Sequence, residues 1–157
     1  MESIGYIDKS TPGGEAHVRP SDEQLAIYMS SMTAEDAGEG VRMRYPLHYS
    51  DGYIAEHDAE IVAQVRSTDH LRSTPEGLAW QLSAVQGHDT LARLGEIRHE
   101  TLVQHGEGDG IVPVENGRVL ARGIPNARLT VYPVAKHIYF SELADAVNAE
   151  ITDFLLG

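Results

Sequence analysis

The C-terminal part of the chain alternates between strand-like and helical patterns, and this alternation constrains the fold more than any other feature. Residues 101–105 and 128–132 have strand-like patterns, and residues 113–122 between them have a helical one. A further helix is expected over 141–156, where one face carries Leu143, Val147, Ile151 and Phe154. Strands separated by a helix are typical of parallel pairing, because parallel strands need a long crossover connection. An α/β fold is therefore expected.

The residues before this part predict one strand followed by a long helical region. Residues 3–8 alternate weakly and lead into a turn-rich segment at 9–14, which suits a short strand and a loop. Residues 21–98 are mostly helical in pattern. Helix starts are indicated at Ser21, at Thr33 with Asp36 as its capping-box partner, at Ser50 and at Thr74.

Three signals inside this region predict where helices end. Pro46 lacks an amide donor and is expected to stop the helix that begins near Thr33. Gly87 is expected to end the helix that begins at Thr74, in the left-handed conformation that glycine adopts easily. A break near 57–58 is considered for the helix that follows Ser50.

Length and composition limit the class of protein. The 157 residues suit one domain, and no apolar run approaches the roughly 20 residues needed to cross a bilayer. Twelve basic and twenty-four acidic residues give a net charge of -12, which disfavours nucleic acid and anionic membranes as partners. The chain has no cysteine, and its eight histidines lack metal-ligand spacing, so no metal or other cofactor is expected. The first residues lack the pattern of a secretory signal, and a cytoplasmic location is expected.

Asp109 and His137 are the candidate catalytic residues. Each follows a predicted strand, and ligands of open parallel sheets bind beyond the carboxyl ends of the strands. A carboxylate there can accept the imidazole N–H, fix the tautomer of the histidine and stabilise its charged form. Two simpler interpretations stay open: Asp109 caps the helix that begins near Pro113, and His137 is a surface histidine before a helix capped by Ser141.

Residues 88–157 resemble the C-terminal third of an α/β-hydrolase. The resemblance rests on residues 88–90, 94, 97, 101–103, 105–107, 109, 112–118, 124–129, 133–137, 140 and 142. In that family the acid follows the seventh strand and the histidine follows the eighth, in the chain order nucleophile, acid, base. The resemblance therefore implies that Asp109 is the acid and His137 the base.

The rest of the chain resembles other parts of the same fold. Residues 15–95 are similar to the helical cap of such enzymes, and the first 14 residues to the sixth strand and its exit. This implies three units: strand and loop of the core (1–14), helical cap (15–98) and the C-terminal part of the core (99–157). The expected fold is a truncated α/β-hydrolase with a parallel sheet of about three strands, flanking helices and a cap.

The nucleophile is missing from this pattern, because no serine lies in a G-x-S-x-G turn. Three residues also depart from the family pattern. Glu100 stands where proline is usual, Gln104 puts an amide in a normally apolar strand, and Lys136 replaces a small residue before the histidine. A buried Gln104 would need hydrogen-bond partners, and Lys136 puts a cation beside the imidazole.

Two functions are compared on this basis. In the first, the chain is a fragment of an ester, lactone or thioester hydrolase that supplies Asp109 and His137, while a missing or partner segment supplies the serine. Attack by Ser10, by Ser141 or by water activated at His137 is the less favoured route. In the second, the chain is a non-catalytic domain that self-associates or binds a small apolar ligand.

The expected partners follow from these two functions. They are an ester-like small molecule and either a complementing N-terminal hydrolase half or a second copy that pairs through the exposed sheet edge. A start of the sequence inside a longer gene is a third explanation for the missing half.

Overall fold

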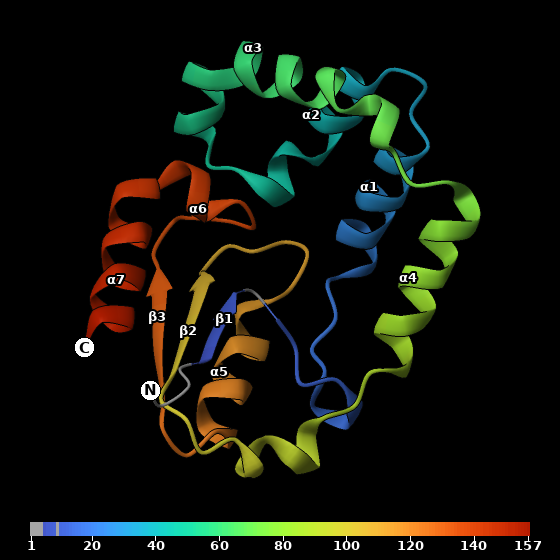
Figure 1. Ribbon diagram of the computed structural model, residues 1–157. Coiled ribbons are helices and arrows are strands. Elements are labelled where there is room, and N and C mark those ends of the chain that lie inside the picture. The colour runs from blue at the N-terminus through green and yellow to red at the C-terminus, as the bar shows by residue number, and fades with distance from the viewer. Residues whose placement is uncertain (1–4, 9) are drawn as a thin grey trace.

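The structure, a computed structural model, describes residues 5–8 and 10–157 and has a three-stranded parallel sheet (Figure 1). The strands are β1 (Gly5–Asp8), β2 (Thr101–Gly106) and β3 (Ala127–Tyr132), in the order β1-β2-β3. Thr101 pairs with Ala127 and Gly106 with Tyr132, so β2 and β3 end at the same level. The predicted α/β class and the short parallel sheet are confirmed, although residues 3 and 4 of the first predicted strand lie outside the described residues.

Helices cover both faces of the sheet. On one face, Val103 packs with Leu120 of helix α5 (Val114–Gly123) and with Ile124, the residue that follows this helix. Leu94 of the 3-10 helix η3 (Leu91–Glu96) belongs to the same cluster. On the other face, Tyr132 packs with Tyr139 and Val147 of helices α6 (Tyr139–Glu142) and α7 (Ala144–Leu156). Side chains of a strand alternate between the two faces, which explains why β2 is buried along its whole length.

Gln104 has the buried partners that its position demands. Its Nε2 donates to the Tyr132 hydroxyl and to the Glu150 carboxylate on α7, and Gln104 is fully buried. Tyr132 and Thr130 also donate to Glu150. Burial would raise the pKa of Glu150, but the hydrogen bonds from Thr130, Tyr132 and Gln104 outweigh burial and hold that pKa below its usual value. Gln104 stands in a strand that is normally apolar in the family, and its amide is therefore satisfied by a polar network that joins β2, β3 and α7.

Four helices between β1 and β2 form the segment that we call the helical insertion, residues 22–87. They are α1 (Asp22–Met32), α2 (Ala37–His48), α3 (Asp51–Ser67) and α4 (Pro75–Gly87), with the short 3-10 helices η1 (Gly14–Ala16) and η2 (Asp69–Leu71) nearby. Three predicted N-caps are confirmed: Ser21, Ser50 and Thr74 each accept a hydrogen bond from the first turn. The start predicted at Thr33 is wrong, because Thr33 is the C-cap of α1 and Asp36 caps α2. The division of the chain at residues 14 and 98 stays a prediction.

The predicted stop at Pro46 and the considered break at 57–58 are wrong. Pro46 lies in the last turn of α2, which still closes because the amide of Tyr49 donates to the carbonyl of Tyr45. Helix α3 is continuous, and Asp58 in its middle accepts hydrogen bonds from Arg42 and Tyr45 of α2. These contacts between the two helices stabilise α3 at the position where a break was considered from its sequence.

Two other predicted helix ends also differ from the structure. Gly87 is not left-handed; α4 ends because His88 is extended and its carbonyl accepts the amide of Gly14. The helix predicted over 141–156 is divided into α6 and α7 at Leu143, whose ψ of 33° interrupts the regular hydrogen bonding. Ser141 lies inside α6 and does not cap it.

Helices α1 and α4 leave apolar side chains in solvent. No residue of α4 is buried, and Trp80 is 76% exposed. Val85 of α4 and Leu25 and Met29 of α1 are exposed as well. In the view of Figure 1 both helices stand on the β1 side of the sheet, and no strand pairs with the outer edge of β1 within residues 5–8 and 10–157. These four apolar side chains are therefore left uncovered by the described part of the chain.

None of the described helices combines the length and the apolar character that a membrane crossing requires.

Replacement of Glu150 by alanine should destabilise the fold. The substitution removes an acceptor shared by Gln104, Thr130 and Tyr132, and loss of such partners costs about 1–3 kcal/mol. Urea denaturation at pH 7 should show this decrease in the free energy of unfolding. Asp153→Ala, which changes an exposed acid of the same helix, is the matched control, and an equal effect of both variants would contradict the stabilising role of the network.

Candidate active site

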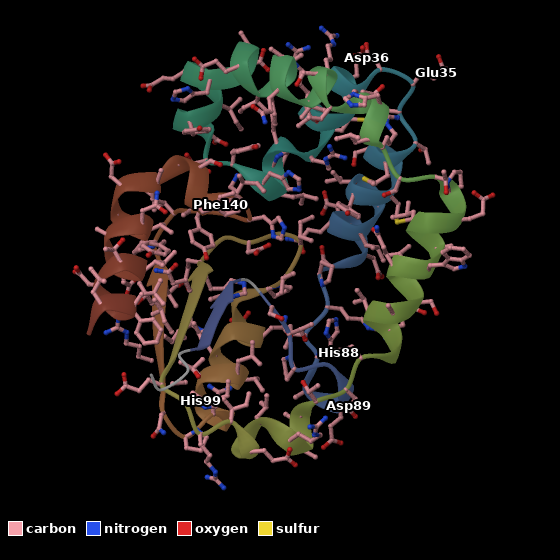
Figure 2. The ribbon with its side chains drawn as sticks, viewed as in Figure 1. Glu35, Asp36, His88, Asp89, His99 and Phe140 are labelled. Carbon is pink, nitrogen blue, oxygen red and sulfur yellow. The ribbon has the colours of Figure 1, made fainter. Side chains whose placement is uncertain are left out.

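The two predicted catalytic residues lie at the same end of the sheet. Asp109 lies in the loop after β2, and His137 lies between β3 and α6. Figure 2 marks the two ends: Phe140, just after His137, lies near α2 and α3, whereas His99, just before β2, lies at the opposite end. The parallel direction of β2 and β3 therefore places both loops under the helical insertion.

Asp109 and His137 form a close hydrogen-bonded pair. Nδ1 of His137 lies 2.9 Å from Oδ2 and 3.0 Å from Oδ1 of Asp109, so an Nδ1–H donates to the carboxylate. The Asp109 side chain is fully buried, and 16% of the His137 side chain is exposed. With Nδ1 occupied, Nε2 is the nitrogen left to exchange a proton with another molecule. The structure thus brings together the two residues that the sequence predicted to pair.

Asp109 is held in its ionised form by several donors. The amides of Ile111 and Val112 each donate to Oδ1 at 2.8 Å. Burial would raise the pKa of Asp109, but hydrogen bonds from His105, His137 and the Val112 amide outweigh burial and hold the pKa well below its usual range. The simpler interpretation of Asp109 is wrong, because α5 begins at Val114 without a side-chain cap.

His105 supports the same loop from inside the protein. Its ring is buried, its Nε2 lies 2.7 Å from the carbonyl oxygen of Val112, and that nitrogen is 3.5 Å from Oδ2 of Asp109. The Nε2–H therefore donates within the loop, while the other ring nitrogen, Nδ1, is buried and has no hydrogen-bond partner among the described residues. His105 thus has a structural role in holding the loop that carries Asp109.

The two loops touch because Gly106 has no side chain. A Cβ at this position would lie 2.3 Å from the carbonyl oxygen of Lys136 and 2.8 Å from that of Ala135. The amide of Gly108 donates to Ala135, and the amide of Glu107 donates to Tyr132. The end of β2 therefore fixes the backbone just before His137.

The C-terminal turn of α2 holds both loops from above. The carbonyl of Leu47 accepts the amides of Gly110 and His137, and the carbonyl of His48 accepts the amide of Ile138. The last carbonyls of a helix have no partner inside the helix, so they are free to bind neighbouring loops. The position of the helical insertion is thereby tied to the position of the pair.

His48 is a residue of this site that the sequence did not reveal. Its imidazole stacks on that of His137, with ring centroids 5.4 Å apart and an interplanar angle of 29°. A basic residue in the last turn of a helix signals only a favourable helix end, so no sequence pattern connects it with His137. Lys136, expected beside the imidazole, places its Nζ 3.8 Å from Asp51 of α3.

No nucleophile accompanies the pair in the described chain. Neither Ser10 nor Ser141 makes a hydrogen bond to His137 among the described residues. The described residues also contain no group of three or more His, Asp or Glu side chains arranged to hold a metal ion. An acid and a base can move a proton here, and covalent catalysis needs a hydroxyl from elsewhere.

Comparison with known proteins gives this arrangement its context. The chain is 30% identical to 2-hydroxy-6-oxo-6-phenylhexa-2,4-dienoate hydrolase of Comamonas testosteroni over 98% of this chain and 55% of that protein. It superposes on the enol-lactonase of Burkholderia xenovorans with a TM-score of 0.73 and 23% identity, over 98% of this chain and 56% of the lactonase. The chain belongs to the α/β-hydrolase family.

The likeness extends to an esterase as well. The esterase of Exiguobacterium antarcticum superposes with a TM-score of 0.75 and 18% identity, over 99% of this chain and 57% of the esterase. No family model matches the chain. In all three comparisons this α/β-hydrolase chain spans about half the length of the protein that it matches.

Gly106→Ala should disturb the pair through the backbone. The added Cβ would push against the carbonyls of Lys136 and Ala135, and overpacking of this kind costs about 1–3 kcal/mol. We expect a lower free energy of unfolding and a weaker hydrogen bond between Asp109 and His137, seen as faster exchange of the Nδ1–H by NMR. Gly108→Ala is the control, because its Cβ would meet the flexible Lys136 side chain at 3.3 Å.

Asp109→Asn should change how stability depends on pH. The carboxyl pKa in the folded state is depressed, so the ionised pair stabilises the protein above the unfolded pKa of about 3.9, and the gain is lost as the pH falls through the folded pKa. At pH 7 the variant should be less stable by about 3 kcal/mol, and the difference should shrink below about pH 5. Urea denaturation between pH 3 and 7 measures this; a difference independent of pH would refute it.

Proposed function

We propose that this chain supplies the acid and the base of a Ser-Asp-His hydrolase for carboxylic esters, lactones or thioesters. The hydrogen bond between Asp109 and His137 at the carboxyl ends of β2 and β3 is the observation that carries the proposal. In this proposal the nucleophilic serine belongs to another segment or to a partner chain.

The chemistry follows from the orientation of the pair. Nε2 of His137 removes the proton of the serine hydroxyl while its oxygen attacks the substrate carbonyl carbon. Asp109 keeps the proton on Nδ1 and stabilises the imidazolium that forms. His137 then returns the proton to the leaving oxygen or sulfur, and water hydrolyses the acyl-enzyme with the same base.

Two features of the structure support a complementing hydrolase half as the source of the serine. The outer edge of β1 has no strand partner among the described residues, and α1 and α4 expose apolar side chains on the same side in Figure 1. The chain also matches only 55% of the Comamonas relative. A partner that carries further strands and a serine turn would add to the β1 edge and cover Trp80.

The substrate class follows from the relatives and from a small cavity near the pair. The similar proteins are described as a dienoate hydrolase, an enol-lactonase and an esterase, and the last two names carry the lactone and ester classes proposed here. A cavity of about 260 Å³ lies between α3 and the segment before His137, lined in part by Tyr53 and Ala135 and by the acidic residues Glu56 and Glu142. The catalytic pair does not line this cavity, and the volume and mixed lining of the cavity suit only a small group.

The second candidate function is a non-catalytic domain that self-associates. The same β1 edge and the apolar residues of α1 and α4 favour it, since two copies could pair edge to edge and cover both surfaces. The net charge of -12 opposes this association. Analytical ultracentrifugation tests this candidate, because self-association predicts a dimer of the chain alone, and a monomer at all concentrations would refute it.

A chimera tests the catalytic proposal directly. This chain replaces the matching part of the Comamonas hydrolase, and hydrolysis of a p-nitrophenyl ester is measured after a folded product is confirmed by circular dichroism. His137→Ala should lower kcat by at least about three orders of magnitude, because the serine loses its base. His99→Ala is the control, since His99 is exposed and lies at the opposite end of the sheet (Figure 2). An active chimera whose rate is unaffected by His137→Ala would refute the assignment.

The fluorescence emission of Trp80 tests for a complementing half without an activity measurement. It is the only tryptophan of the chain and is largely exposed, so its emission should shift to shorter wavelength when a partner covers α4. The chain alone and the chimera can be compared at equal concentration. Identical emission in both would contradict a partner that packs against α4.

A further inference from the structure

The stacked ring of His48 adds a second constraint on His137. The hydrogen bond to Asp109 holds one atom of the imidazole, Nδ1, but leaves the ring plane able to turn about that bond. A ring stacked at 5.4 Å and 29° limits this rotation. Together the two contacts determine the direction in which Nε2 points.

His48 is itself held firmly in place. Its backbone carbonyl accepts the amide of Ile138, so His48 moves with the segment that carries His137. Its ring contacts Tyr49 edge-on, with centroids 6.0 Å apart. Tyr49 in turn contacts Tyr45 edge-on at 5.9 Å and stacks on Tyr53 at 5.6 Å. A row of aromatic rings from α2 and α3 therefore lies behind the ring that covers His137.

Backbone contacts next to His48 hold the end of α2 against the two loops of the site. The carbonyl of Leu47 accepts the amides of Gly110 and His137 at 3.4 Å, which ties both loops to the same turn. A Cβ at Gly110 would lie 2.8 Å from Cδ2 of Leu47 and 3.0 Å from its Cα, so this loop and α2 are in close contact. These contacts hold the side chain of His48 against one face of the His137 imidazole.

We propose that His48 is a positioning residue that fixes the ring plane of His137, so that Nε2 faces the nucleophile. The proposal rests on the function proposed above for His137, and it adds that the helical insertion takes part in aligning the base. His48 acts through His137 and transfers no proton itself. Its aromatic ring is the feature required, so another flat ring of similar size should replace it.

NMR of the chain alone tests this without any nucleophile. With ¹⁵N-labelled histidine, the Nδ1–H of His137 should give a downfield proton signal that Asp109→Asn abolishes. His48→Ala should broaden or remove that signal and shift the ring protons of His137 as the neighbouring ring current is lost. His48→Phe should restore both. His88→Ala is the control, because His88 is exposed and lies at the end of α4 (Figure 2).

The outcomes separate this proposal from the proposed function. An unchanged His137 signal in His48→Ala, or a His48→Phe variant that behaves like His48→Ala, would overturn the positioning role and leave the Asp109–His137 pair intact. Absence of the signal in the unmodified chain would overturn both. If His48→Ala does not fold, His48→Leu keeps side-chain volume without a ring and takes its place. In the active chimera, His48→Ala should lower kcat at least tenfold while KM changes less than twofold.

Discussion

The parallel pairing of β2 with β3 is the constraint on which the rest of the site depends. Its register ends both strands together, with Gly106 opposite Tyr132, so the loops that follow leave the sheet at the same level. Gly106 then allows the two loops to come into backbone contact. With the two loops in contact, the side chains of Asp109 and His137 lie within hydrogen-bonding distance.

The helical insertion contributes to the same geometry from the opposite side. The unsatisfied carbonyls at the end of α2 accept amides from both loops, and the ring of His48 lies against His137. This explains why α2 continues past Pro46: its last turn is stabilised by contacts outside the helix. A segment far from the strands in sequence therefore takes part in orienting the candidate base, which connects the packing of the insertion with the chemistry of the pair.

Hydrogen-bonding groups near the pair have partners, with Nδ1 of His105 as an exception among the described residues, whereas the periphery exposes apolar surface. Asp109 accepts hydrogen bonds from His137 and from two backbone amides, and Gln104 has a polar network of its own. Outside, apolar residues of α1 and α4 remain exposed and β1 has an open edge within the described part of the chain. In the function proposed above, a complementing hydrolase half would cover these surfaces.

The sequence alone determined what depends on neighbouring residues. Caps such as Ser21 and Thr74, the alternation of strand and helix, and the placement of Asp109 and His137 after strands are local patterns, because backbone hydrogen bonding and side-chain periodicity act over a few residues. Tertiary structure decided the rest: the extension of α2 past Pro46, the interruption at Leu143, the exposure of α4 and the stacking of His48 on His137. The stacking of His48 and the exposure of α4 depend on how segments far apart in the chain are arranged, which local patterns do not encode.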